Sequence, residues 1–159
     1  MKSHISWADA RVLADAARAK GGTVVTTNGC FDILHRGHLS YLTASRKLGD
    51  LLIVGINSDA SVKKLKGPDR PINNQEDRAL LLSALRVVDA VCVFDEDTPV
   101  EWLQSIEAKI HTKGADYKGK AIPEIEAVKK WGGKISYIDF VADYSTTKTL
   151  QKMKGPLVK

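Results

Sequence analysis

Two histidines, His35 and His38, are the residues of this sequence best suited to chemistry. They lie in a turn that contains glycine and polar residues and is followed by a helical pattern of apolar residues. Their imidazole N–H groups therefore stand beside the unpaired backbone N–H groups of a helix start, which attract anions. Gly29 permits a close approach to the backbone, and Gly37 lets both rings reach one phosphate-sized space. This pattern predicts a site for a polyanion and indicates nucleotide chemistry.

The turn that carries the histidines is predicted to join the first strand of a parallel sheet to the next helix. The short apolar run at residues 23–25 is typical of a buried strand, which is expected over residues 23–27. Apolar residues then recur at helical spacing over residues 39–48. Ligands of parallel α/β sheets bind beyond the carboxyl ends of the strands, where such a turn lies. The two histidines are therefore expected to lie in a ligand site.

Strands and helices alternate along the rest of the chain. Further strands are expected at short apolar runs, at residues 51–56, 90–94, 110–112 and 135–138. Further helices are expected at residues 7–17, 75–88, 99–106 and 123–131, with a last one near the C-terminus. Residues 57–73 are expected to form a polar loop. The alternation predicts a small doubly wound α/β domain with a mostly parallel five-stranded sheet and helices on both faces.

Several helix starts are marked by capping residues. Ser6 and Asn74 are expected to cap the helices that follow them. Residues 98–101 form an expected capping box with proline at the first helical position, and Ser145 or Thr146 is expected to cap the last helix. These signals divide the chain into regular elements without a linker or an internal repeat.

Size and charge restrict the classes of function. The chain has 159 residues, which suits one domain over residues 1–159, and 24 Lys and Arg against 19 Asp and Glu leave a net charge of +5. This mild excess of positive charge suits a small anionic substrate. The sequence has no basic stripe interleaved with aromatic residues, so nucleic-acid binding is not expected. The sequence has two cysteines, which form no Cys-x-x-Cys pair, and it has no signal peptide and no long apolar run. These features predict a cytoplasmic protein without a membrane partner.

Residues 27–38 read Thr-Asn-Gly-Cys-Phe-Asp-Ile-Leu-His-Arg-Gly-His, which resembles the HxGH signature of the nucleotidyltransferase superfamily, cytidylyltransferases included. The resemblance extends over about residues 24–150, and further stretches fit it at residues 57–59, 65–71 and 145–148. The combination is most similar to the D-glycero-D-manno-heptose 1-phosphate adenylyltransferases. Many of those enzymes are fused to a sugar kinase, and this chain resembles the stand-alone form.

The resemblance implies a Rossmann-like fold and a reaction. The sugar-phosphate oxygen would attack the α-phosphorus of ATP in line and release pyrophosphate, giving ADP-heptose for lipopolysaccharide synthesis. Positioning and stabilisation of the charge on the phosphoryl oxygens would supply the catalysis. Mg²⁺ would arrive with ATP, because this ion prefers phosphate oxygens and few protein ligands. The family also implies a homo-oligomer.

The resemblance assigns roles to residues of this sequence. The implied catalytic residues are basic side chains near the phosphates, namely His35, His38, Lys66 and Arg70, with Lys64 as a competitor of Lys66. The implied nucleotide-binding residues come from three stretches, namely Thr27, Asn28, Gly29, Phe31, Gly37, Lys113, Gly114, Asp116, Ser145, Thr146 and Thr147. Asp32 and Asp59 are expected to bind the acceptor, and stabilising the turn is an equally good role for Asp32. Arg78 is expected to be structural rather than to bind phosphate.

Other functions remain open at this point. A cytidylyltransferase that acts on glycerol 3-phosphate or a similar small phosphate is the nearest alternative within the same class. A non-catalytic nucleotide-binding module is an alternative of another class, although it would not need both histidines or the loop lysines. Cys30 is expected to pack as a small buried residue beneath the turn rather than to act as a nucleophile.

Overall fold

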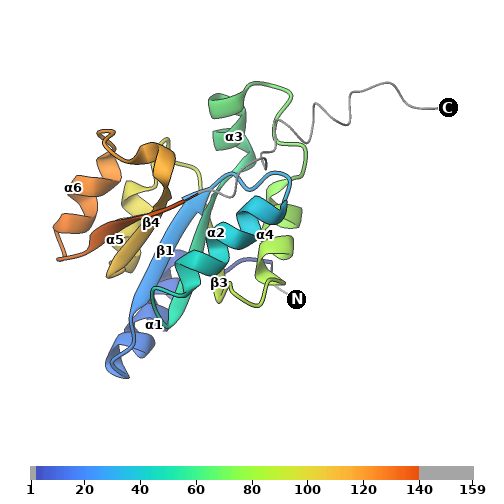
Figure 1. Cartoon of the computed structure of the whole chain (residues 1–159). Coiled ribbons are helices and arrows are strands. Elements are labelled where there is room, and N and C mark those ends of the chain that lie inside the picture. The colour runs from blue at the N-terminus through green and yellow to red at the C-terminus, as the bar shows by residue number, and fades with distance from the viewer. Residues whose placement is uncertain (1–2, 140–159) are drawn as a thin grey trace.

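A parallel β-sheet with helices on both faces forms the described part of the chain, residues 3–139 of the computed structural model (Figure 1). Its five strands are β1 (Val24–Gly29), β2 (Leu51–Asn57), β3 (Ala90–Phe94), β4 (Ile110–Gly114) and β5 (Lys134–Ile138). They lie in the order β3-β2-β1-β4-β5, and every neighbouring pair is parallel. The expected fold class is confirmed.

The helices cover both faces of this sheet. They are α1 (Trp7–Ala19), α2 (Arg36–Arg46), α3 (Asp59–Lys66), α4 (Gln75–Ser83), α5 (Val100–Ile106) and α6 (Pro123–Lys129), with a short 3₁₀ helix, η1, at Ala115–Tyr117. Residues of α1, α5 and α6 share one buried cluster, and residues of α2 and α4 share the other. Val24 and Val25 of β1 belong to opposite clusters, as the alternation of side chains along a strand requires.

The sheet order creates a switch point beside β1. The chain runs outward from β1 through β2 to β3, and then returns to the other side of β1 as β4 and β5. Two loops that leave β1 and β4 in opposite directions open a crevice at the carboxyl ends of these strands, where ligands of such sheets bind. The fold therefore places the turn with the two histidines at that crevice.

One glycine of β2 is needed for packing. A Cβ atom on Gly55 would lie 2.8 Å from the ring of Trp102, which is fully buried. Because such a contact is too short for carbon atoms, the helix α5 packs this closely only against a residue without a side chain. The apolar run of β2 therefore contains a glycine in its middle.

The expected polar loop over residues 57–73 is wrong in its first half, where the structure has the helix α3. Ser58 caps this helix by accepting a hydrogen bond from the backbone N–H of Ser61. Within α3 only Ser61 and Val62 are buried, and three lysines occupy its last turn. So short a helix with so narrow a buried face has no clear apolar period, which is why the sequence pattern suggested a loop.

The ends of several elements also differ from the expectations. Ser6 and Asn74 cap α1 and α4 as predicted, but α4 ends at Ser83 rather than near residue 88. The expected capping box at residues 98–101 is wrong, because Pro99 is the N-cap of α5 and no side chain caps this helix. β4 extends through Gly114, so the loop expected from residue 113 begins later. The expected last helix lies outside the described residues.

Within residues 3–139, no helix combines the length and the apolar character that crossing a membrane requires.

Candidate active site

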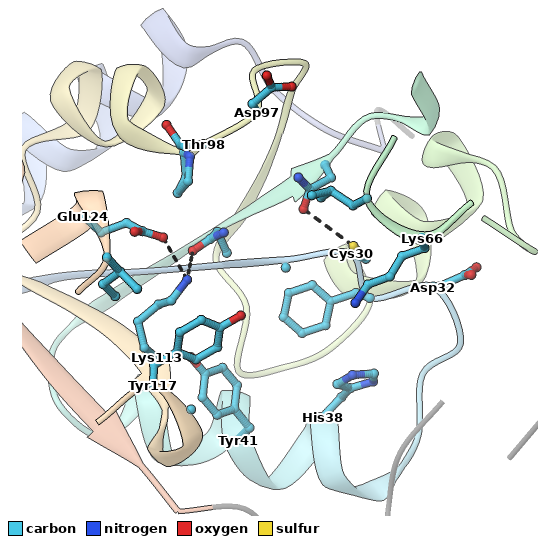
Figure 2. Close-up of a pocket in the computed structure, with 18 of the residues that line it drawn as sticks. Cys30, Asp32, His38, Tyr41, Lys66, Asp97, Thr98, Lys113, Tyr117 and Glu124 are labelled. Atoms are coloured by element: carbon cyan, nitrogen blue, oxygen red, sulfur yellow. Dashed lines mark hydrogen bonds and ion pairs between the residues drawn. The ribbon is translucent and has the colours of Figure 1, made fainter. Parts of the chain in front are cut away.

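A cavity of about 630 Å³ opens at the carboxyl edge of the sheet (Figure 2). Its size is within the range of small-molecule sites in proteins. It is lined by residues that follow β1, β2, β3 and β4, namely Asn28, Gly29, Cys30, Phe31, Asp32, His35, Gly37, His38, Tyr41, Asn57, Leu65, Lys66, Arg70, Asp97, Thr98, Pro99, Lys113, Gly114, Tyr117, Ile122, Pro123 and Glu124. Side chains distant in the sequence thus meet around one space.

The two histidines stack on each other at the start of α2. His35 is the N-cap, and its Nδ1 accepts a hydrogen bond of 3.3 Å from the backbone N–H of His38. The ring centres are 3.8 Å apart and the planes differ by 17°. Because Nδ1 of His35 is an acceptor, the ring proton of neutral His35 lies on Nε2. Both rings line the cavity beside the positive end of the helix.

Burial lowers the pKa of both imidazoles, which favours their neutral forms in the ligand-free protein. Burial, together with the neighbouring His35, lowers the pKa of His38 to about 4, and the Ile33 carbonyl opposes this decrease. Burial also lowers the pKa of His35. Nδ1 of His38 is buried without a hydrogen-bond partner among residues 3–139. An anionic ligand beside the two rings would favour their protonated forms.

Phe31 holds the ring of His38 from the side. The two ring centres are 5.1 Å apart with an interplanar angle of 62°, which is an edge-on contact. Phe31 has a φ of 46°, which is unusual for a residue with a side chain and costs about 1 kcal/mol or more. The turn therefore holds a strained residue next to the histidine pair, as functional sites often do.

Asp32 ties a basic loop to the cavity. Its carboxylate accepts hydrogen bonds from Nε of Arg70 at 2.6 Å, from the backbone N–H of Ile72 at 2.8 Å and from that of Asn73 at 2.9 Å. Burial by itself raises the pKa of Asp32, but the bonds from Asn73, Ile72 and Arg70 outweigh burial and lower it. This geometry suits the turn-stabilising role, and acceptor binding by Asp32 stays a prediction.

Arg78 connects the same turn to two other segments. It is fully buried and donates to the Cys30 carbonyl at 2.7 Å, to the Asn73 carbonyl at 3.0 Å and to the Asp59 carboxylate at 2.8 Å. The structural role expected for Arg78 agrees with these contacts. Asp59, which is paired in this way, does not line the cavity.

A buried ion pair forms the opposite wall of the cavity. Nζ of Lys113 donates to Oε1 of Glu124 at 2.9 Å and to Oδ1 of Asn28 at 3.2 Å (Figure 2). The same ammonium lies 4.6 Å from the ring centre of Tyr117, within the range of a cation–π contact. Side chains from β1, β4, η1 and α6 therefore form one polar group.

The structure brings most of the predicted site residues to the cavity, namely Asn28, Gly29, Phe31, Asp32, His35, Gly37, His38, Lys66, Arg70, Lys113 and Gly114. Thr27 lies beneath it, buried and hydrogen-bonded to the Tyr41 hydroxyl at 2.7 Å. Asp116 is exposed on η1 and does not line the cavity. Ser145, Thr146 and Thr147 lie outside the described residues, so their roles stay predictions.

The two competing lysines of α3 lie differently. Lys66 lines the cavity, whereas Nζ of Lys64 lies 3.5 Å from the carboxylate of Asp97 on a side chain that is 68% exposed. The structure therefore favours Lys66 over Lys64 as the lysine that reaches a ligand.

Cys30 differs from the expectation of a buried packing residue. It is half-buried and lines the cavity, and its thiol donates to Oδ1 of Asn57 at 3.8 Å. Burial, the largest effect, raises the pKa of the Cys30 thiol although nearby cations oppose it. A thiol of this kind is a poor nucleophile at neutral pH, in agreement with the rejected nucleophilic role.

Several lining residues at or after the ends of other strands had no predicted role, although Asn57 lies in a stretch that fits the family resemblance. Asn57 ends β2, Asp97 and Thr98 follow β3, and Tyr117 and Glu124 follow β4. The rule that ligands meet the carboxyl ends of neighbouring parallel strands could have found the first three. Glu124 gives no such signal, because it lies in a helix ten residues after β4, where it lines the cavity beside Lys113.

Comparisons with known proteins agree with this geometry. A family model described as cytidylyltransferase-like matches residues 26–154. The chain is 55% identical over 131 residues to the "Bifunctional protein HldE" of Campylobacter concisus, covering 82% of this chain and 27% of that protein. It is 49% identical over 138 residues to the protein of the same name from Trichlorobacter lovleyi, covering 87% and 28%.

A solved structure is also similar. The crystal structure of the lipopolysaccharide core biosynthesis protein from Thermoplasma volcanium GSS1 matches with a TM-score of 0.62 and 31% identity, over 79% of this chain and 100% of that one. The chain spans less than a third of the length of the curated relatives named above.

Proposed function

This chain belongs to the cytidylyltransferase-like family, and on that premise we propose that it transfers AMP from ATP to D-glycero-D-manno-heptose 1-phosphate. The family and the curated relatives make it a nucleotidyltransferase. The choice of a heptose acceptor is supported by the sequence resemblance and by the relatives, one of which is described as a lipopolysaccharide core biosynthesis protein. The product would be ADP-heptose, for lipopolysaccharide synthesis.

The observation that carries the proposal is the stacked histidine pair at the start of α2. Two imidazoles, a helix N-terminus and the basic side chains of Lys66 and Arg70 line one cavity. The helix cap and the bond to Asp32 account for His35 and Arg70 one at a time, but not for the gathering of four donor side chains around one cavity. A bound triphosphate would use all of them.

The reaction needs no protein nucleophile. An anionic oxygen of the sugar 1-phosphate forms a bond to the α-phosphorus of ATP, while the bond between this phosphorus and the bridging oxygen breaks. Pyrophosphate leaves with the electron pair, and no proton transfer is required because the attacking oxygen is already ionised. The work of the chain is to align the two phosphates and to stabilise the charge that grows in the transition state.

The residues of the cavity divide this work. His35 and His38 donate hydrogen bonds to the oxygens of the α-phosphate, together with backbone N–H groups at the start of α2. Lys66 and Arg70 neutralise the charge of the phosphates that face α3 and its following loop. Nε of Arg70 donates to Asp32, which holds the guanidinium in place. Within residues 3–139 its terminal nitrogens make no other bond, so they face the phosphates.

Mg²⁺ is expected to come with the nucleotide. The residues described in the structure hold no cluster of three His, Cys, Asp or Glu side chains that could bind a metal. We expect the ion to be carried by triphosphate oxygens and to keep most of its water ligands. When bound, the ion would lower the negative charge of the phosphates.

A pyrophosphate-release assay tests the proposal. ATP and CTP are each offered with heptose 1-phosphate, glucose 1-phosphate or glycerol 3-phosphate as the acceptor, in the presence of Mg²⁺. We expect turnover with ATP and the heptose acceptor. Turnover with CTP and glycerol 3-phosphate alone would instead make the chain a cytidylyltransferase, and nucleotide binding without turnover on any acceptor would overturn the transfer reaction itself.

A further inference from the structure

A buried cluster beside the cavity has no assigned part in the reaction above. Asn28 ends β1, Lys113 lies near the end of β4, and Glu124 lies in the first turn of α6. The side chains of Lys113 and Glu124 are 9% and 6% exposed, and their charged atoms are 2.9 Å apart. The sheet and one helix thus bring an ion pair and an amide together at one wall (Figure 2).

Stability alone does not explain this ion pair. The free energy lost when two charges leave water offsets most of the free energy gained from their mutual attraction. An apolar pair of the same size would therefore stabilise the fold equally well. What apolar residues cannot do is orient a neighbouring amide. Lys113 gives one N–H to Glu124 and one to Asn28. The Lys113–Glu124 pair can therefore orient the Asn28 amide.

The contact with Lys113 fixes the orientation of the Asn28 carboxamide. An ammonium group only donates hydrogen bonds, so it must meet the oxygen of the amide and not its NH₂ group. With Oδ1 held at 3.2 Å from Lys113, Nδ2 is the end that remains for a ligand, and Asn28 lines the cavity. No residue in the described part of the chain accepts a hydrogen bond from this Nδ2. Asn28 is consequently presented as a donor.

We infer that Glu124 is a positioning residue, which holds Lys113 so that the Asn28 NH₂ group donates to an oxygen of the bound nucleotide. This inference rests on the proposed function, since it names a contact within the nucleotide site. It also makes the part expected for Lys113 more specific, because two N–H groups of its ammonium are bound by protein groups. Lys113 acts on the nucleotide through the Asn28 side chain that it orients.

A double-mutant cycle on Asn28 and Glu124 tests the inference, with the dissociation constant of ATP measured by calorimetry in the presence of Mg²⁺. We expect Asn28→Ala and Glu124→Ala each to weaken ATP binding by about tenfold, the value of one good hydrogen bond. The double variant should bind no more weakly than the weaker single variant. Both side chains bind the same ammonium group of Lys113, so such coupling points to Lys113 as the link.

A matched control is available on the same helix. Glu126 pairs with Lys129 at 2.7 Å on the surface, with both side chains more than half exposed. Glu126→Ala should leave ATP binding unchanged. If Glu124→Ala binds ATP as tightly as the unaltered chain, or if the two single effects multiply in the double variant, the positioning role is wrong.

A second variant covers the case in which Glu124→Ala does not fold because it leaves Lys113 buried without a partner. Lys113→Met with Glu124→Met removes both charges at once and avoids that cost. We expect this variant to lose about tenfold in ATP affinity, and Asn28→Ala should weaken it no further. Unchanged affinity in the methionine variant would contradict the inference.

The readout separates this inference from the proposed reaction. ATP affinity is measured without an acceptor, so the result of the double-mutant cycle does not depend on which sugar phosphate is the acceptor. If the unaltered chain uses CTP instead, the proposed nucleotide is wrong, and the same cycle is measured with CTP. Turnover of ATP by the unaltered chain together with independent effects of Asn28 and Glu124 would refute the positioning role alone.

Discussion

His35 accepts a hydrogen bond from the backbone N–H of His38 and stacks on its ring at 3.8 Å. One histidine thus caps the helix on which the other stands, and the cap fixes the ring that faces the cavity. The pair is therefore a single unit, in which the position of each ring depends on the other. Its proposed role is to stabilise charge that develops on phosphate oxygens during the transfer.

Replacing His38 should lower the rate more than the affinity for ATP. A donor used mainly in the transition state is worth roughly 10² or more in kcat. We therefore expect His38→Asn to lose that factor in steady-state pyrophosphate release, with a small change in KM for ATP. His4, which pairs with Glu76 away from the cavity, provides the control, since His4→Asn should keep full activity. Equal losses in both variants would contradict the role of His38.

ATP binding should take up protons in mildly acidic solution. In the ligand-free protein the pKa of His38 is about 4, so at about pH 5.5 this ring is neutral. A triphosphate beside the ring favours the imidazolium and raises its pKa, which means that the complex holds more protons than the free chain. The His38 contribution to ATP affinity therefore increases as the pH falls from neutral.

Calorimetry in two buffers with different ionisation enthalpies measures this proton uptake. His35 and the nucleotide can also exchange protons on binding, so the quantity of interest is the difference between the unaltered chain and His38→Asn. We expect a positive difference of up to about one proton per ATP bound near pH 5.5. Identical proton uptake in both proteins would show that His38 does not meet the phosphates.

The two lysines of α3 offer a matched comparison of similar residues. Lys66 lines the cavity and Lys64 lies at the surface near Asp97. Lys66→Met should reduce kcat/KM by tenfold or more, since a charge that faces phosphate is lost, whereas Lys64→Met should change it less than about twofold. Steady-state kinetics of both variants decides the matter. A larger effect at Lys64 would reverse the assignment.

The first strand, the histidine turn and α2 could be predicted from the sequence because their signals are local. An apolar run, a glycine-containing turn and a helical period lie within about 25 residues of each other, as β1 and α2 confirm. The same reasoning located all five strands. Local patterns are informative here because buried parallel strands are continuously apolar.

The rest of the site depends on distant pairings that no local pattern contains. Lys113 and Asn28 are 85 positions apart and meet because β1 pairs with β4. Glu124 joins them from a helix, and Arg78 is buried because two carbonyl groups and the Asp59 carboxylate accept its hydrogen bonds. In the sequence, a single charged residue of this kind suggests a solvent-exposed position. Its burial becomes understandable only when the fold shows its partners.

Replacing Asp32 should damage both the stability of the loop and catalysis. Asp32→Asn keeps the shape of the side chain but loses the charge that holds Arg70 and the N–H groups of Ile72 and Asn73. We expect the free energy of unfolding to fall by about 1–3 kcal/mol, as for hydrogen bonds to a charged group. Because Arg70 loses its anchor, kcat should fall as well. Urea unfolding and steady-state kinetics measure the two effects.

The pH dependence of unfolding distinguishes this role of Asp32 from a general loss of packing. The hydrogen bonds from Asn73, Ile72 and Arg70 lower the pKa of Asp32 in the folded chain, so the unfolded chain binds this proton more readily. The stability that Asp32 contributes is therefore complete above its unfolded pKa and is lost as the pH falls through the folded value. The difference in unfolding free energy between the unaltered chain and Asp32→Asn should shrink in acid. A constant difference from neutral to acid pH would mean that the charge of Asp32 does not hold the loop.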